Sequence, residues 1–89
     1  MHVKDGVFMV RDYKTIKRMY DAAGIDLADK VRKLCSRDIQ LTKVIFYYPN
    51  RNLDFRSPYE LCVRGRRKDV ERFIDAWIKG TLSEFVLNP

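Results

Sequence analysis

The fold class depends on residues 39–48, whose sequence is IQLTKVIFYY. This segment is rich in β-branched and aromatic residues, which are enriched in β-strands. It is followed at 49–52 by PNRN, in which proline and asparagine favour a turn. The pattern therefore predicts a strand over 39–48 that ends in a tight turn.

The residues after this turn alternate in character, as expected for a second strand. Apolar and charged residues alternate over 53–56, and after an interruption at Ser57 and Pro58 the segment 59–64 places Leu61 and Val63 on one face. Two apolar segments around a turn are typical of a β-hairpin. We therefore expect one interrupted strand, or two short ones, paired with residues 39–48.

Helical periodicity lies on both sides of this expected hairpin. Asp12 and Asp26 are candidate N-caps, and Gly24 is suited to end the first of these two helices. A third helix follows Gly65 and is expected to end at Gly80. Apolar residues spaced by three or four positions give each helix one buried face. These faces are Ile16, Met19, Tyr20 and Ala23; Leu27, Val31, Leu34 and Cys35; and Val70, Phe73, Ile74, Trp77 and Ile78.

The two ends of the chain complete the predicted architecture. Residues 3–10 contain a short apolar run that is expected to form a first strand, and the apolar tail 81–89 is expected to dock on the core, with a last strand as one option. A chain of 89 residues has room for one domain. The sequence thus predicts a single α+β domain over 1–89. It is a two-layer sandwich with helices on one face of an antiparallel sheet, of which the ferredoxin-like βαββαβ plan with its first helix broken at Gly24 is one form.

The charge of the chain is concentrated around the expected hairpin. The formal net charge is +6, and residues 43–68 contain seven Lys or Arg and two Asp or Glu, which gives +5 for that segment alone. A strongly basic segment favours an anionic partner, either a nucleic acid or an acidic protein surface. We therefore expect the functional surface to lie there.

The basic segment also carries aromatic residues. Arginine and lysine bind phosphates, and aromatic rings stack on unpaired bases, so this mixture favours RNA or single-stranded DNA. The sequence therefore predicts a small non-enzymatic protein that contacts nucleic acid, or a nucleic-acid-processing assembly, through a basic and aromatic hairpin. The candidate contact residues are Lys43, Tyr47, Tyr48, Arg51, Arg56, Tyr59, Arg64, Arg66, Arg67 and Lys68.

A second hypothesis from a different class is a protein-interaction module, such as a regulator or inhibitor. It would bind an acidic partner through the same basic residues, or form a homodimer through its apolar tail and the edge of its sheet. The longest apolar run, 44–48, is far shorter than the roughly 20 residues of a membrane-spanning helix. We expect a cytoplasmic protein without a membrane partner.

The sequence lacks the groups of catalytic and metal-binding residues that most enzyme classes need. The only histidine is His2, the acidic residues are scattered, and Cys35 and Cys62 stand alone, so we expect no metal, no cofactor and two buried free thiols. A metal-independent ribonuclease is the remaining enzymatic alternative, because arginine, lysine, tyrosine and glutamate can support phosphate chemistry. Its candidate residues are Tyr59, Glu60, Arg64, Arg66 and Lys68. The plan of helices followed by a basic sheet resembles that of ribosome-dependent toxin ribonucleases, without a residue-by-residue match to their motif.

Overall fold

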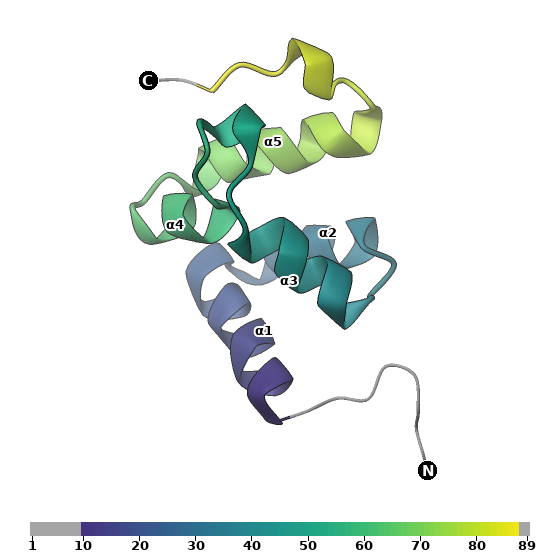
Figure 1. Ribbon diagram of the computed structural model, residues 1–89, viewed down its shortest axis with the longest axis vertical. Coiled ribbons are helices and arrows are strands. Elements are labelled where there is room, and N and C mark those ends of the chain that lie inside the picture. The colour runs from purple at the N-terminus through teal and green to yellow at the C-terminus, as the bar shows by residue number, and fades with distance from the viewer. Residues whose placement is uncertain (1–9, 88–89) are drawn as a thin grey trace.

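The computed structural model describes residues 10–87, and this part of the chain is built from helices and turns (Figure 1). Five α-helices follow one another in it: α1 (Val10–Ala23), α2 (Ile25–Leu34), α3 (Ile39–Tyr47), α4 (Pro58–Val63) and α5 (Arg67–Lys79). Two 3₁₀ turns, η1 (Arg51–Leu53) and η2 (Leu82–Glu84), lie before α4 and after α5.

The predicted α+β sandwich is wrong, because the described residues contain no sheet. Residues 39–48 lie in α3 and at its end, and the expected second strand is divided between η1 and α4. The structure shows one isolated antiparallel bridge in this part of the chain, between Asn50 and Arg56. The described part of the tail, 81–87, forms η2 and a short extended segment. The expected first strand lies outside the described residues apart from Val10, which begins α1. The resemblance to toxin ribonucleases rested on a basic sheet and is lost with it.

The first two helices are confirmed, with small differences at their starts. Ile16, Met19 and Ala23 of α1 are buried, as the spacing predicted. Gly24 alone connects α1 to α2, and its φ of 86° lies in the left-handed region that favours glycine. Asp26 lies inside the first turn of α2 instead of capping it, since the cap is Gly24. Likewise α1 begins before the predicted cap Asp12, so Asp12 becomes a residue of the helix.

Helix α3 forms because a cap and a helical apolar face outweigh the β propensity of its residues. The Asp38 side chain accepts a hydrogen bond from the Leu41 backbone N–H at 2.8 Å, and the Thr42 hydroxyl donates to the Asp38 carbonyl at 2.7 Å. Thr42 and Phe46 are fully buried four positions apart. Side-chain packing routinely overrides propensity, so the β-branched residues of this segment do not prevent a helix.

Helix α4 begins at a proline that we interpreted as a strand interruption. The Ser57 side chain accepts from the Glu60 backbone N–H at 3.0 Å, and Pro58 occupies the first turn, where its missing N–H costs nothing. Leu61 is fully buried, whereas Val63 is 63% exposed. The predicted shared face of Leu61 and Val63 is therefore wrong, because residues two apart point in different directions on a helix.

Helix α5 is confirmed, and Gly80 ends it in the left-handed conformation with φ 76°. Val70, Phe73 and Ile74 are fully buried, and Trp77 packs partly buried against the core with its ring edge toward Phe73. Ile78 was expected on the buried face but is 54% exposed. The apolar side chains of α5 are therefore less buried toward the C-terminal end of the helix.

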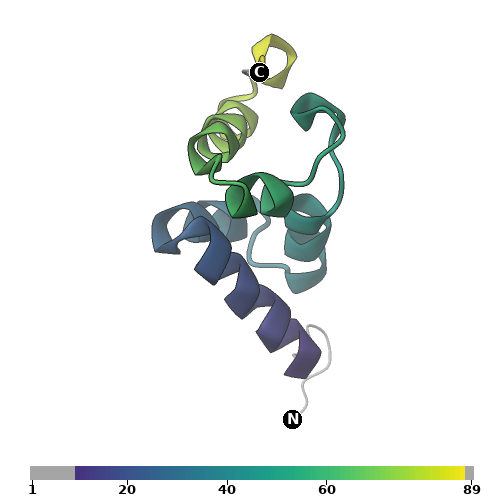
Figure 2. The same cartoon turned by 90° about the vertical axis from the view of Figure 1, so that its left-hand side faces the viewer.

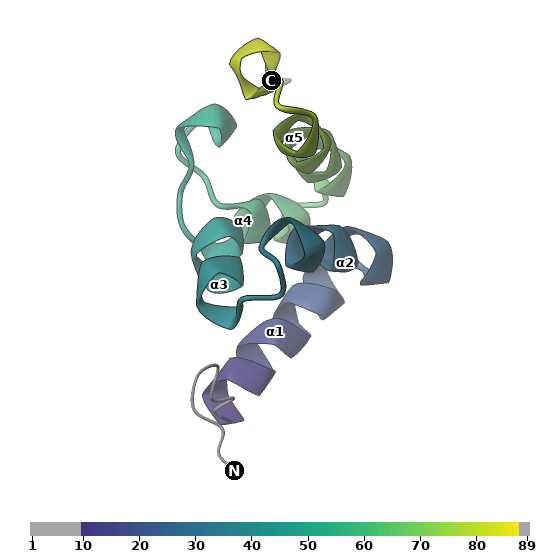
Figure 3. The same cartoon turned by 90° about the vertical axis from the view of Figure 1, so that its right-hand side faces the viewer.

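The helices pack around one core. In all three views α1 lies at one end of the molecule, α5 and η2 lie at the other, and α4 lies between them (Figures 1, 2 and 3). Helix α4 contacts α1, α3 and α5. The largest fully buried side chains come from every α-helix and from η1: Met19, Val31, Phe46, Leu53, Leu61, Val70, Phe73 and Ile74. Within residues 10–87, each helix is too short or too polar to cross a membrane.

Candidate functional site

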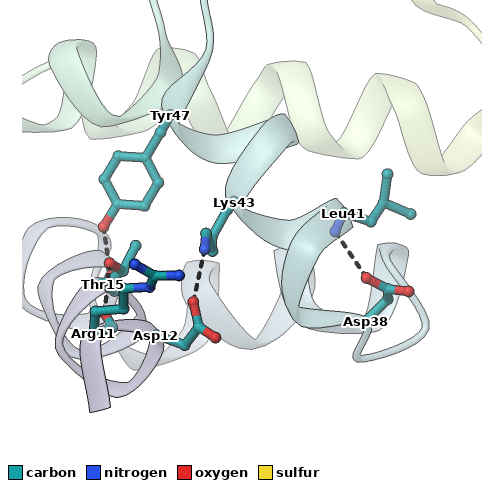
Figure 4. A network of polar contacts seen from close by, with 7 residues as sticks. All are labelled: Arg11, Asp12, Thr15, Asp38, Leu41, Lys43 and Tyr47. Carbon is teal, nitrogen blue, oxygen red and sulfur yellow. Dashed lines mark hydrogen bonds and ion pairs between the residues drawn. The ribbon is translucent and has the colours of Figure 1, made fainter. Parts of the chain in front are cut away.

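The loss of the hairpin separates the ten predicted contact residues. Lys43 lies on α3 and points toward α1, where its Nζ is 2.7 Å from Oδ1 of Asp12 (Figure 4). The Asp12 side chain is 3% exposed and that of Lys43 28% exposed. Lys43 therefore compensates a buried carboxylate and is not placed to bind a phosphate.

Two of the three predicted stacking tyrosines are part of the packing between helices. The Tyr47 hydroxyl donates to the Thr15 carbonyl of α1 at 2.6 Å (Figure 4), and the Tyr47 and Tyr59 ring centroids are 4.9 Å apart. Phe46 completes this cluster through edge contacts with both rings. Burial, and then the nearby Tyr59, raise the pKa of Tyr47 to about 12. Of the three, Tyr48 remains exposed.

Most of the predicted arginines have partners inside the molecule. Arg56 and Arg64 lie 3.9 and 3.0 Å from the Glu60 carboxylate. Arg66 bonds to Asp69 at 2.7 Å. These pairs reduce the charge that the basic segment offers to a polyanion, because each carboxylate offsets a neighbouring cation.

Arg67 has a structural contact of a different kind. Its guanidinium donates to the Ala22 carbonyl at 3.0 Å, at the end of α1. A cation near the last carbonyls of a helix stabilises that end. The same guanidinium lies so close to Gly24 that a Cβ there would be 3.1 Å from its Nη1. Arg67 thus fixes the corner between α1 and α2.

Three of the predicted arginines, two of them already described as paired, line a cleft between η1 and the tail. This basic cleft has a volume of about 550 Å³ and carries three arginines against one carboxylate. Its lining residues are Arg51, Asn52, Asp54, Arg56, Arg66, Phe85, Val86 and Leu87. A second hollow, which includes Arg66, Arg67 and Lys68, shares Arg66 with it. Five predicted residues are therefore brought together at these two neighbouring hollows.

The wall of the basic cleft beside η1 is a tight loop. The Asn50 side chain accepts from the Asn52 N–H at 2.8 Å, and the Asn50 backbone N–H donates to the Arg56 carbonyl at 3.1 Å. Inside this loop Asp54 and Phe55 both have positive φ, 58° and 63°. Phe55 is 71% exposed. The loop thus holds a phenylalanine in water in a conformation that bulky residues rarely adopt.

The other wall is the C-terminal tail, which Arg72 of α5 holds in place. Its Nη2 donates to the Val86 carbonyl at 2.8 Å, and its guanidinium lies 5.0 Å from the centre of the Phe85 ring. Phe85 also packs edge-on against Phe73. Leu82 and Leu87 pack against the core as well. The predicted docking of the tail is therefore confirmed for these side chains, whereas Val86 remains exposed.

The thiols and carboxylates are not arranged as a reactive site. Cys35 and Cys62 are both free and buried, as predicted. Burial raises both pKa values, that of Cys62 to about 11, which opposes the reactive thiolate. Among residues 10–87, no three His, Cys, Asp or Glu side chains are grouped as a metal site. Of the residues considered for a ribonuclease, Tyr59 is packed beside Tyr47, and Glu60 is paired with arginines.

Comparison with protein-family models, with curated proteins and with solved structures finds no match to this chain. The site is therefore interpreted from its own residues. The sequence did not indicate that Phe55 is exposed, because alternation over residues 53–56 of a strand places Phe55 on the same apolar face as Leu53. The signal was the asparagine at 50, which favours turns and fixes the loop through its side chain.

Proposed function

We propose that this protein is a small, non-enzymatic protein-interaction module that binds an acidic segment of a partner protein at the basic cleft. The observation that carries this proposal is the lining of the basic cleft, in which three arginines stand against one carboxylate. The exposed Phe55 belongs to the loop that forms one wall of this cleft. Two free buried thiols are typical of a reducing compartment, so we place the module in the cytoplasm.

The conformation of Phe55 supports a role in recognition. A left-handed conformation costs a residue with a Cβ about 1–2 kcal/mol. Phe55 offsets little of this by burial, since 71% of it is exposed. Strained residues that persist without a packing benefit are concentrated at ligand-binding sites. Aromatic anchors of this kind contribute much of the binding energy of protein interfaces.

The charges that line the basic cleft indicate the chemistry of the partner. Arg51, Arg56 and Arg66 face the cleft, against the single carboxylate of Asp54. Arg56 and Arg66 are positioned by Glu60 and Asp69, which orders their guanidinium groups before a ligand arrives. Arginine forks bind carboxylates with two parallel hydrogen bonds. A segment with acidic side chains next to an apolar one fits this lining.

A single-stranded nucleic acid fits the same cleft less well. Stacking on unpaired bases needs accessible aromatic faces. Of the three predicted stacking tyrosines only Tyr48 is exposed, because Tyr47 and Tyr59 are packed against each other and Phe46. Two of the predicted cationic contacts have structural roles away from the cleft, Lys43 at the buried Asp12 and Arg67 at the end of α1. Nucleic acid binding by this segment is therefore the competing outcome of the test below.

The test is to apply the protein to an array of short random peptides. We expect bound peptides to be enriched in Asp or Glu next to an apolar residue. Phe55→Ala should raise the Kd for the bound peptides by tenfold or more, and a tenfold increase corresponds to about 1.4 kcal/mol. Val63→Ala is the matched control, because Val63 is a similarly exposed apolar residue that lies on α4 and not in the loop 50–56.

Two results would overturn the proposal. One is a set of bound peptides with no acidic preference or no dependence on Phe55. The other is salt-sensitive binding of single-stranded RNA that Arg51→Ala abolishes, which would return the cleft to the nucleic-acid hypothesis. Cleavage of that RNA by the intact protein would establish the ribonuclease alternative.

A further inference from the structure

The outward face of α1 carries a row of cations that the sequence analysis did not single out. Arg11, Lys14 and Arg18 are all exposed and follow at spacings of three and four residues. Successive residues of an α-helix turn by about 100°, so these three side chains fall within an arc of about 60°. The basic segment predicted from the sequence, 43–68, does not include them.

Within residues 10–87, these cations have no neutralising partner on their own face. The exposed acid of this face, Asp21, is paired with Lys17 at 3.1 Å, and Asp12 is turned inward to Lys43. Among the described residues, no carboxylate lies within ion-pair distance of Arg11, Lys14 or Arg18. Like charges one turn apart destabilise a helix. The row is therefore kept at a cost to the helix, which differs from the paired arginines near the basic cleft.

The position of α1 leaves this face accessible. The opposite side of the helix, with Ile16, Met19 and Ala23, is buried in the core. Figures 2 and 3 show α1 at one end of the molecule, with the other helices on one side of it. The helix has 14 residues, which corresponds to a length of about 21 Å. An extended ligand can therefore lie along the row.

We propose that the outward face of α1 is a binding surface for duplex DNA, which it contacts through phosphates without reading sequence. A helix with its side chains is about 10–12 Å wide, and the major groove of B-DNA is about 12 Å wide. The row extends over about 10 Å, whereas duplex DNA presents one charge for every 1.7 Å or so of its axis. Each of the three cations thus has phosphates within reach.

Other anionic partners fit the row less well. A membrane-surface helix buries its apolar face in lipid, but the apolar face of α1 is already buried in the core. Single strands are bound by rows of aromatic residues, and the exposed side of α1 offers one aromatic residue, Tyr13, which has another contact. The major groove of duplex RNA is too narrow for a helix. Duplex DNA is therefore the ligand that the geometry favours.

The experiment is fluorescence anisotropy with a labelled duplex DNA of random sequence, at about 50 and 200 mM monovalent salt. Three phosphate contacts contribute about 2.7 to the slope of log Kd against log salt, which raises Kd about 40-fold between these concentrations. The variant Arg11→Gln/Lys14→Gln/Arg18→Gln should lose this increase. Glutamine is a good helix former, so α1 should remain folded.

The matched control is Lys33→Gln/Arg37→Gln/Lys79→Gln, which removes three exposed cations from α2, the turn after it and α5. Both variants lower the formal net charge from +6 by three, so overall charge cannot explain a difference between them. The control should keep the 40-fold salt dependence. Thermal melting checks that both variants fold. If the triple α1 variant does not fold, the single variant Arg18→Gln replaces it and should lower the slope of log Kd against log salt by about 0.9.

The proposal is overturned if the two triple variants bind duplex DNA equally, or if single-stranded RNA binds as tightly as the duplex through the same residues. It does not depend on the basic cleft. The α1 variant should bind the same array peptides as the parent, and Phe55→Ala should bind duplex DNA normally.

Discussion

Replacing Lys43 by alanine should destabilise the protein strongly, because it leaves the carboxylate of Asp12 without its cation. The two atoms are 2.7 Å apart, and the Asp12 side chain is 3% exposed. Removing one partner of a buried ion pair costs about 3–5 kcal/mol. Asp12 has a further interaction, so we expect the lower end, about 3 kcal/mol. In a domain of this size that lowers the Tm by about 12–24 °C.

The assay is thermal and urea unfolding of Lys43→Ala, followed by circular dichroism, with Lys14→Ala as a control for the loss of an exposed lysine. The double variant Asp12→Leu/Lys43→Met should be more stable than Lys43→Ala, since it removes the unpaired charge together with its partner. If the free energy of unfolding of Lys43→Ala lies within about 0.5 kcal/mol of that of the parent, as is usual for surface substitutions, then Lys43 does not compensate a buried charge. Lys43 would then return to the candidate phosphate contacts.

Three further outcomes are expected. Arg67→Ala should lower the free energy of unfolding by about 1 kcal/mol in urea, because it removes a hydrogen bond to the Ala22 carbonyl and the positive charge at the end of α1. An unchanged urea midpoint would contradict this role. Trp77→Ala should cost about 3 kcal/mol in the same assay, at the low end for a large aromatic residue because Trp77 is only partly buried; melting like the parent would show that it lies outside the core. The free energy of unfolding should be unaffected by these groups below about pH 9 and should fall as the pH rises toward 11. The reason is that burial raises the pKa of Cys62 to about 11 and that of Tyr47 to about 12, so the folded state binds more protons than the unfolded state in this range. A Tm that is equal at about pH 8 and 10.5 would refute this.

The sequence was sufficient where helical spacing and glycine agreed. Helices α1, α2 and α5 were predicted, together with their ends at Gly24 and Gly80, because the apolar period was long enough to separate a helix from a strand. The buried free thiols and the docking of the tail were predicted as well.

The sequence was misleading where short apolar segments carry β-branched and aromatic residues. In α3, the period of the apolar residues is too short to distinguish a helix from a buried strand, and the signal that decides for a helix is the cap at Asp38. In α4, Ser57 and Pro58 are a helix start that we interpreted as a break. These two errors turned a helical domain into a sandwich.

The candidate site was predicted as a region but not as an arrangement. Composition located the basic residues, yet it contains no information about which of them meet a carboxylate within the fold. Lys43 and Asp12 are 31 positions apart, and only the packing of α1 against α3 brings them together. The exposed Phe55 depends on two consecutive left-handed residues, which neither spacing nor propensity indicates.

The contact of Arg67 with the end of α1 has a consequence for the order in which the protein is made. The corner at Gly24 leaves the ribosome first, and the residue that fixes it follows 45 positions after Ala22. At translation rates of about 5–20 residues per second, the corner waits about 2–9 s for its partner. The contact that braces the corner between the first two helices therefore forms only after the start of α5 has been made.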